Sequence, residues 1–251
     1  MSTAIKRAMP CLASLLCLGV LAFNASAAEI QQKGTHLRIQ FDKDSPDTIL
    51  IGMDVGSIVV IVNDEPAVGF ANVRNISIKG GDQNDYLGIS VEIEGNLTIK
   101  SGAGDDSIYV SGVYHKNVKV NLGDGDDIHY EFENAMSVGG SYSVKAGKGN
   151  DYVLWDQHIF VGKSMSIDQG AGTVDGGNEN MAMRGTYIYD IGKKLSIKLA
   201  KEGGQVAMLE NVSASQLIVR GGKGNDTVDL SEGDNNFDKI KLKKIETLLE
   251  P

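Results

Sequence analysis

Cysteine is nearly absent from this chain of 251 residues. Only Cys11 and Cys17 occur, and both lie close to the amino terminus. A fold built on several disulfides and a zinc site made of cysteines are therefore excluded. Histidine is also scarce and lacks the spacing of metal ligands, so we expect surface or turn positions for all four residues: His36, His115, His129 and His158.

Aromatic side chains make up only 6% of the sequence, and there are four prolines against 31 glycines. A conventional sandwich core uses more large side chains, whereas a chain that turns often uses more glycine. No long apolar run follows Phe23, which excludes a later transmembrane helix. The formal net charge of −9 makes nucleic acid an unsuitable partner and cations a suitable one.

The amino terminus has the pattern of an export signal. Lys6 and Arg7 precede an apolar stretch from Ala8 to Phe23, and the small residues Ala25-Ser26-Ala27 close it. This order of charged, apolar and small residues predicts a signal peptide over residues 1–27. The alternative, a transmembrane anchor, needs a longer apolar core. We therefore expect a secreted or periplasmic protein without a transmembrane anchor.

A strand-like word recurs through most of the remaining chain. It reads NISIKGG at Asn75, NLTIKSG at Asn96 and NVKVNLG at Asn117, and apolar and polar side chains alternate within each copy. This period of two is typical of a half-buried strand. The steps from copy to copy are 21, 21, 24, 23, 30, 22 and 23 residues, measured between the central apolar residues Ile78, Ile99, Val120, Val144, Ile167, Ile197, Val219 and Leu242.

A recurring unit of this size predicts an all-β protein, a right-handed parallel β-helix (β-solenoid) of about eight coils. We divide the chain into the signal peptide over residues 1–27, a non-repeating amino-terminal β cap over 28–73 and the β-helix over 74–251. The step of 30 predicts a loop over 172–185. An antiparallel β-sandwich is the competing fold, because its strands also recur at regular intervals; repetition of the same residue words favours the solenoid.

Glycine–aspartate words stand before the second strand of several repeats. GGKGNDTVD at Gly221 matches the nonapeptide G-G-x-G-N/D-D-x-apolar-x. SGAGDDSIY at Ser101 and AGKGNDYVL at Ala146 match it except at the first glycine, and LGDGDDIHY at Leu122 and GGDQNDYLG at Gly80 are looser copies. These words resemble the haemolysin-type calcium-binding (RTX) repeats, here in a longer coil. Family repeats carry two such motifs per coil, whereas this chain carries one.

The resemblance implies calcium as the cofactor, bound between successive coils by aspartates and glycine carbonyls. Calcium takes six to eight oxygen ligands, and a cation between stacked carboxylates would also remove their mutual repulsion. Asp226 has no matching neighbour in the adjacent repeats, although its own motif is the cleanest. The candidate metal ligands are Asp85, Asp105, Asp106, Asp126, Asp127, Asp151 and Asp226.

The same turns also have a purely structural interpretation. Asp and Asn side chains commonly close turns by accepting backbone N–H groups, and glycine supplies positive φ. Asn84, Asn150 and Asn225 occupy equivalent positions and would form uncharged ladders between coils. The residues alone leave both interpretations open.

These features predict an exported calcium-binding β-solenoid, of a type found in bacteria, with a structural, adhesive or matrix role. The expected partners are calcium ions and a polysaccharide or cell-surface component, with self-association as a further expectation. The alternative is a polysaccharide-active, lyase-like enzyme on the same fold. It would need a base beside clustered carboxylates, and the candidates by residue type are Lys100, Lys145, Lys148 and Arg184.

Overall fold

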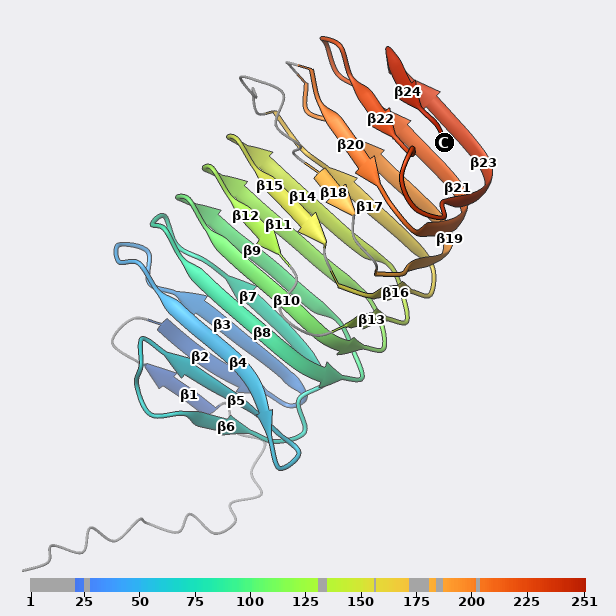
Figure 1. The fold of residues 1–251 in the computed structure, drawn as a ribbon. Coiled ribbons are helices and arrows are strands. Elements are labelled where there is room, and N and C mark those ends of the chain that lie inside the picture. The colour runs from blue at the N-terminus through green and yellow to red at the C-terminus, as the bar shows by residue number, and fades with distance from the viewer. Residues whose placement is uncertain are drawn as a thin grey trace, which may run out of the picture.

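The computed structural model describes residues 21–24, 28–130, 135–155, 157–171, 181–183, 187–201 and 204–251. These residues form strands and turns without a helix, and most of the strands stack in parallel along one axis (Figure 1). The β-solenoid prediction is therefore confirmed, and the competing sandwich is wrong. Each coil contributes strands to three parallel ladders, which we name A, B and C.

Ladder A contains the recurring strand found in the sequence. Its members pair in parallel, each with the strand of the next coil. They are β3 (His36–Phe41), β7 (Asn75–Lys79), β9 (Leu97–Ala103), β11 (Val118–Asp124), β14 (Tyr142–Lys148), β17 (Ser164–Asp168) and the carboxyl-terminal parts of β19 (Tyr189–Lys198), β21 (Val212–Arg220) and β23 (Asn236–Lys243).

Ladder B follows the glycine–aspartate turns. It comprises β4 (Thr48–Asp54), β8 (Tyr86–Ile93), β10 (Ser107–Tyr114), β12 (Ile128–Tyr130), β15 (Tyr152–Trp155), β18 (Met181–Met183), β20 (Val206–Leu209), β22 (Thr227–Asp229) and β24 (Thr247–Leu249). Ladder C closes each coil with the ends of β8 and β10, with β13 (Met136–Val138) and β16 (Ile159–Val161), and with the first residues of β19, β21 and β23.

The register confirms the period read from the sequence. The central apolar residues of ladder A pair in one continuous column that begins at Ile39 and runs through Ile78 to Leu242. The described residues make about seven turns rather than the eight coils expected. Much of the predicted 172–185 loop lies outside the described residues. Right-handed winding stays a prediction.

The first strands add antiparallel pairs at one end of the rod. β1 (Leu21–Asn24), β2 (Ala28–Lys33) and β3 form one antiparallel run, and β4, β5 (Ser57–Val62) and β6 (Val68–Phe70) form another. β3 and β4 also pair in parallel with β7 and β8, so two strands of the segment 28–73 already belong to ladders A and B. β1 falls inside the predicted signal peptide, whose residues 1–20 and 25–27 are not described.

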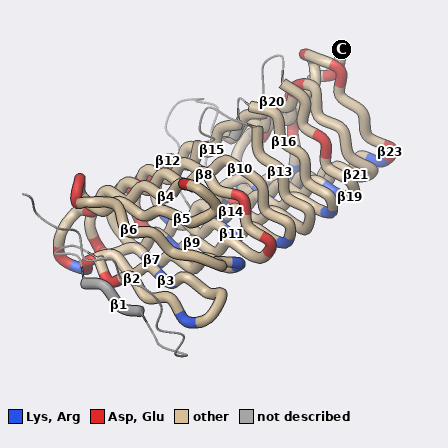
Figure 2. The backbone as a smooth tube through the Cα atoms, turned by 90° about the horizontal axis from the view of Figure 1, so that it is seen from below, with Lys and Arg blue, Asp and Glu red and all other residues tan. Residues whose placement is uncertain are grey.

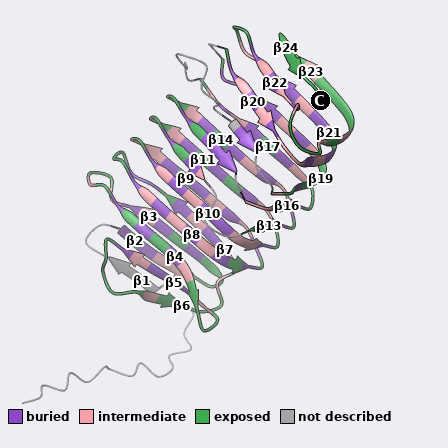
Figure 3. Ribbon diagram, viewed as in Figure 1, coloured by how far each residue is buried: buried purple, intermediate pink, exposed green. Residues whose placement is uncertain are grey.

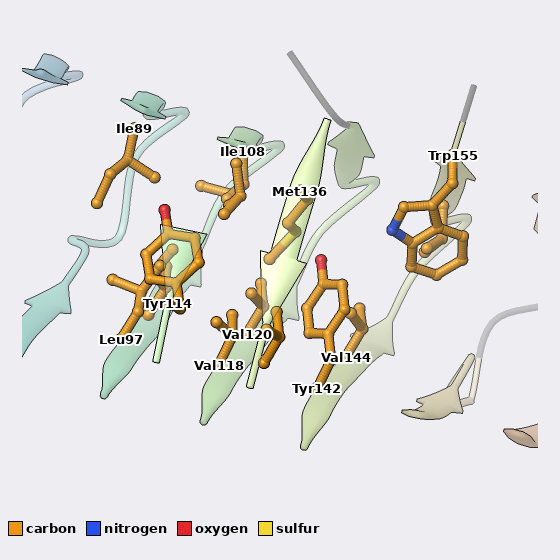
Figure 4. Packing of buried hydrophobic residues seen from close by; sticks show 14 of the residues in the cluster. Ile89, Leu97, Ile108, Tyr114, Val118, Val120, Met136, Tyr142, Val144 and Trp155 are labelled. Carbon is orange, nitrogen blue, oxygen red and sulfur yellow. The ribbon is translucent and has the colours of Figure 1, made fainter. Parts of the chain in front are cut away.

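The core lies inside the coils and consists mainly of stacked aliphatic side chains. Buried residues alternate with intermediate or exposed ones along the strands (Figure 3). Inward residues such as Ile99 in β9 and Val120 in β11 are at most 2% exposed. The residues that alternate with them along each strand face solvent. Larger rings fill the middle of the rod, where Tyr142 and Trp155 pack edge to face (Figure 4). His129 shares this cluster and is fully buried, so the surface position expected for it is wrong. The alternation of residues along β12 directs the side chain of His129 inward, and this alternation predicts its burial better than its polarity does.

Candidate functional site: the aspartate turns

The glycine–aspartate words form the turns that connect ladder A to ladder B. Gly102, Gly123 and Gly147 stack in consecutive coils with φ of 125°, 110° and 126°. A Cβ atom on Gly123 would overlap the carbonyl oxygen of Gly102 in the neighbouring coil. Glycine is thus required both by the positive φ and by the close stacking of the turns. This stacking brings the turn carboxylates into register.

An inner row of carboxylates accepts backbone hydrogen bonds from one coil to the next. The N–H of Asp85 donates to Oδ1 of Asp106 at 2.8 Å, and the N–H of Asp106 donates to Oδ1 of Asp127 at 2.8 Å. The N–H of Asp127 donates to Oδ1 of Asp151 at 3.1 Å. Each carboxylate thereby satisfies an amide at a point between two ladders, where burial would otherwise leave it unpaired. Four of the predicted ligands therefore lie in one line.

An outer row of side chains runs beside the inner one. Its hydrogen bonds have the opposite direction, because each side chain accepts an N–H of the following coil. The N–H of Asp105 donates to Oδ1 of Asn84, and the N–H of Asp126 donates to Oδ1 of Asp105, both at 2.8 Å. The N–H of Asn150 completes the row on Oδ1 of Asp126 at 2.8 Å. These side chains are exposed. Adjacent aspartates are therefore used as a pair, one binding an amide of the preceding coil and the other an amide of the following coil.

Three inner carboxylates keep one oxygen without a partner. Oδ2 of Asp106, of Asp127 and of Asp151 is buried and accepts no hydrogen bond. The hydroxyl of Ser101 donates to the carbonyl oxygen of Leu122, and it lies close enough to Asp106 to lower the pKa of that carboxyl. In the looser turn before β8, by contrast, the N–H of Gly81 donates to Oδ2 of Asp85 at 3.0 Å. In the three middle turns the equivalent residues are Gly102, Gly123 and Gly147, which have positive φ. Their N–H groups do not donate to the Oδ2 atoms of Asp106, Asp127 and Asp151.

Burial changes the acidity of these groups. It raises the pKa of Asp106 and of Asp127 from 3.8 to about 7, and the pKa of Asp151 to about 6. Neighbouring carboxylates of the two rows raise the pKa values further, while the backbone N–H donors act in the other direction. Burial also raises the pKa of Asp85. The row therefore favours either a proton or a cation at its three unpartnered oxygens.

The donor set fits calcium only in part. Within the described part of the chain, no three acidic, histidine or cysteine side chains converge on one point suited to a metal ion. Each inner carboxylate already uses Oδ1 on a backbone N–H, which leaves Oδ2 as its available ligand. Two adjacent Oδ2 atoms fall well short of six to eight ligands, so backbone carbonyls or water would have to supply the others.

Asp226 lies apart from this row and has its own partners. Its Oδ1 accepts the N–H of Gln205 at 2.9 Å and its Oδ2 the N–H of Gly222 at 2.7 Å. The N–H of Asp226 donates to Oε2 of Glu246 at 2.8 Å, so a glutamate continues this second row. Asp47 likewise extends the first row, because its N–H donates to Oδ1 of Asp85 at 2.9 Å. Sequence reasoning missed both; for Asp47, the available signal was an aspartate directly before a ladder B strand.

Two grooves lie on the outward side of ladder A. The larger, about 470 Å³, is lined mainly by polar residues that include Asn75, Asn96 and Asn117. Their side chains form an amide ladder, in which Nδ2 of Asn96 donates to Oδ1 of Asn75 at 3.2 Å and Nδ2 of Asn117 to Oδ1 of Asn96 at 3.0 Å. The second groove, about 270 Å³, includes Lys100 and Lys145 in its lining. Sequence reasoning missed this asparagine ladder, although its residues recur at a step of 21.

Comparisons with known proteins do not assign the chain to a family. No protein-family model, curated protein or solved structure matches the chain. The likeness to haemolysin-type repeats therefore rests on the repeated residues alone. None of the described segments is a helix with the length and apolar character needed to cross a bilayer.

Proposed function

We propose that the protein is an exported β-solenoid with an adhesive or matrix role, which holds a cell-surface component against the outward side of ladder A. The observation that carries this proposal is the position of the two grooves. Both lie on the same ladder, and their linings contain Asn, Ser, Thr, Lys and His but no carboxylate. Such a surface offers hydrogen bonds and positive charge to a ligand without an acid–base pair.

The lyase-like alternative needs a base beside clustered carboxylates. Lys100 and Lys145 line a groove whose described lining has no acidic residue. Nζ of Lys148 lies 2.6 Å from Oδ2 of Asp124 in an exposed ion pair. Arg184 lies outside the described residues. The described geometry therefore favours binding over proton abstraction as the proposed role.

Adhesion of cells or envelope material from the producing organism to protein-coated glass tests this proposal. We expect retention on the wild-type protein and its loss for a variant with Ser77→Trp and Thr98→Trp, which fills the larger groove from the outward side. A control variant, Ser90→Trp, places a single tryptophan ring in β8 of ladder B, away from the groove, and should retain adhesion. Equal retention by all three proteins, or no retention by the wild type, would contradict the proposal.

Calcium binding is the second candidate function. The observation that favours it is the set of three buried carboxylate oxygens, on Asp106, Asp127 and Asp151, that lack a hydrogen-bond donor. A cation bound there would neutralise the row and stabilise the folded state over the unfolded state. Melting of the wild-type protein in calcium and in chelator tests it. A melting temperature that calcium leaves unchanged would assign the aspartate turns a structural role only.

A further inference from the structure

The outward side of ladder A carries a concentration of positive charge that the sequence does not reveal. The strand register places one outward residue of every coil in a single column. From β7 to β23 this column, which with Lys119 we name the basic face, reads Lys79, Lys100, Asn121, Lys145, Asp168, Lys198, Arg220 and Lys243.

The net charge of this column is positive, whereas the net charge of the whole chain is negative. Six of its eight members are basic and one is acidic, although the formal net charge of the protein is −9. Figure 2 shows lysine and arginine segments recurring from coil to coil along the rod. Asp168 is paired with Lys198, whose Nζ lies 2.9 Å from its Oδ1. Across the described residues, no carboxylate pairs with Lys100, Lys119 or Lys145.

Three of these lysines occupy one place. Lys100, Lys119 and Lys145 come from the consecutive strands β9, β11 and β14, and all three line the smaller groove. Strands of neighbouring coils are about 4.8 Å apart, so Lys100 and Lys145 are separated by about 10 Å along the rod. In the strand register Lys119 lies between Thr98 and Ser143, while Lys100 and Lys145 lie on either side of Asn121 in the adjacent column. Positive charge therefore alternates with hydrogen-bonding groups along two neighbouring columns parallel to the rod.

We propose that the basic face binds a linear anionic polysaccharide, laid along the solenoid axis. This inference rests on the proposed adhesive function and names the class of its ligand. Carboxylate or sulfate groups of the glycan pair with the lysines, and its hydroxyl groups bond to the Ser, Thr and Asn side chains of the grooves. Single-stranded nucleic acid fits less well, because its binding surfaces use aromatic rings for base stacking and the outward column from Lys79 to Lys243 contains none.

Binding of purified polymers at low and high salt tests the proposal. The probes are polygalacturonate, dextran sulfate, neutral dextran and a single-stranded DNA oligonucleotide. The basic-face variant is Lys100→Gln, Lys119→Gln and Lys145→Gln, all at exposed positions. The matched control removes the same charge from exposed lysines at the corner between ladders C and A, as Lys116→Gln, Lys163→Gln and Lys193→Gln.

We expect the wild type to bind at least one of the two anionic glycans, with an affinity that falls as salt rises, and to leave neutral dextran unbound. The basic-face variant should lose about tenfold in affinity, since each exposed ion pair contributes modestly, and the control variant should bind as the wild type does. The choice between polygalacturonate and dextran sulfate identifies the anionic group.

Three results would overturn the proposal: no binding to either anionic glycan, equal losses in both lysine variants, or binding of DNA as tight as that of the glycans. The adhesive function is judged separately. Cell adhesion that persists while glycan binding is absent would remove the ligand class and keep the adhesive role. Absence of both would remove the two proposals together.

Discussion

Replacing Asp127 by asparagine tests what the inner carboxylate row contributes to stability. An asparagine at this position keeps an Oδ1 acceptor for the N–H of Asp106, 2.8 Å away in the wild type. It also places an uncharged NH₂ group where the carboxylate has a buried oxygen without a partner. The substitution therefore removes the charge and retains the hydrogen bond between coils.

The magnitude follows from the pKa of the group. Burial raises the pKa of Asp127 from 3.8 to about 7, so the folded state binds this proton more tightly than the unfolded state does. The stability that results is present below about pH 4 and is lost as pH rises to about 7. The difference between the two pKa values corresponds to at most about 4 kcal/mol, and relaxation of the row reduces it, so we expect ~1–3 kcal/mol.

The assay is thermal unfolding of the purified protein in chelator at pH 4, 6 and 8. At pH 8 the Asp127→Asn variant should melt higher than the wild type, by about 2–4 °C for each kcal/mol gained. At pH 4 the two should melt within a few degrees of each other, because the wild-type carboxyl is then neutral too. Asp126→Asn, the same change on the exposed outer row, should have little effect at either pH. A variant that is equally destabilised at pH 4 and pH 8 would refute the reasoning.

Four further substitutions test the architecture and the core. Gly123→Ala adds a Cβ atom at a φ of 110° and against the carbonyl of Gly102, so it should destabilise the protein by on the order of 3 kcal/mol in chemical denaturation; an unchanged midpoint would mean that the turns do not stack. Val120→Ala should cost about 2–3 kcal/mol because Val120 is 2% exposed, whereas Lys119→Ala on the same strand should cost less than about 0.5 kcal/mol; equal costs would place β11 in another register. Burial lowers the pKa of His129 to about 4 from 6.5, so the wild type should lose stability from this group as pH falls from about 6.5 to 4, and His129→Phe should abolish that loss. An identical pH profile in the two proteins between those values would place His129 in solvent.

Much of the architecture could be predicted from local patterns. Alternation of apolar and polar residues identified the inward column from Ile78 to Leu242, and the repeated glycine–aspartate words predicted that Asp85, Asp106, Asp127 and Asp151 lie in line. The alternation repeats along ladder A and the glycine–aspartate motif in four consecutive coils, so a single stacking rule places both. The sequence predicts about eight coils where the described residues make about seven turns, and it predicts a surface position for His129, which is fully buried.

The remaining features depend on register between distant residues. Asp47 and Glu246 continue the two acidic rows from turns that lack the glycine word, so their only mark in the sequence is an acidic residue directly before a ladder B strand. Successive lysines of the basic face are 19 to 53 residues apart in the sequence and look like scattered surface charges there. When the coils stack, such scattered positions come to lie in a line. The pairing of each N–H with its carboxylate likewise depends on how the coils are placed against each other.

The central claim is that the turn carboxylates of successive coils lie in stacked rows. A structure from crystals grown at pH 8 in calcium tests this claim most directly. We predict electron density in which Oδ1 of Asp106, Asp127 and Asp151 each accepts the N–H of the aspartate one coil earlier, whether or not an ion is bound at Oδ2. Density that places these three side chains on different sides of the molecule would contradict the stacked rows and the ion proposal with them.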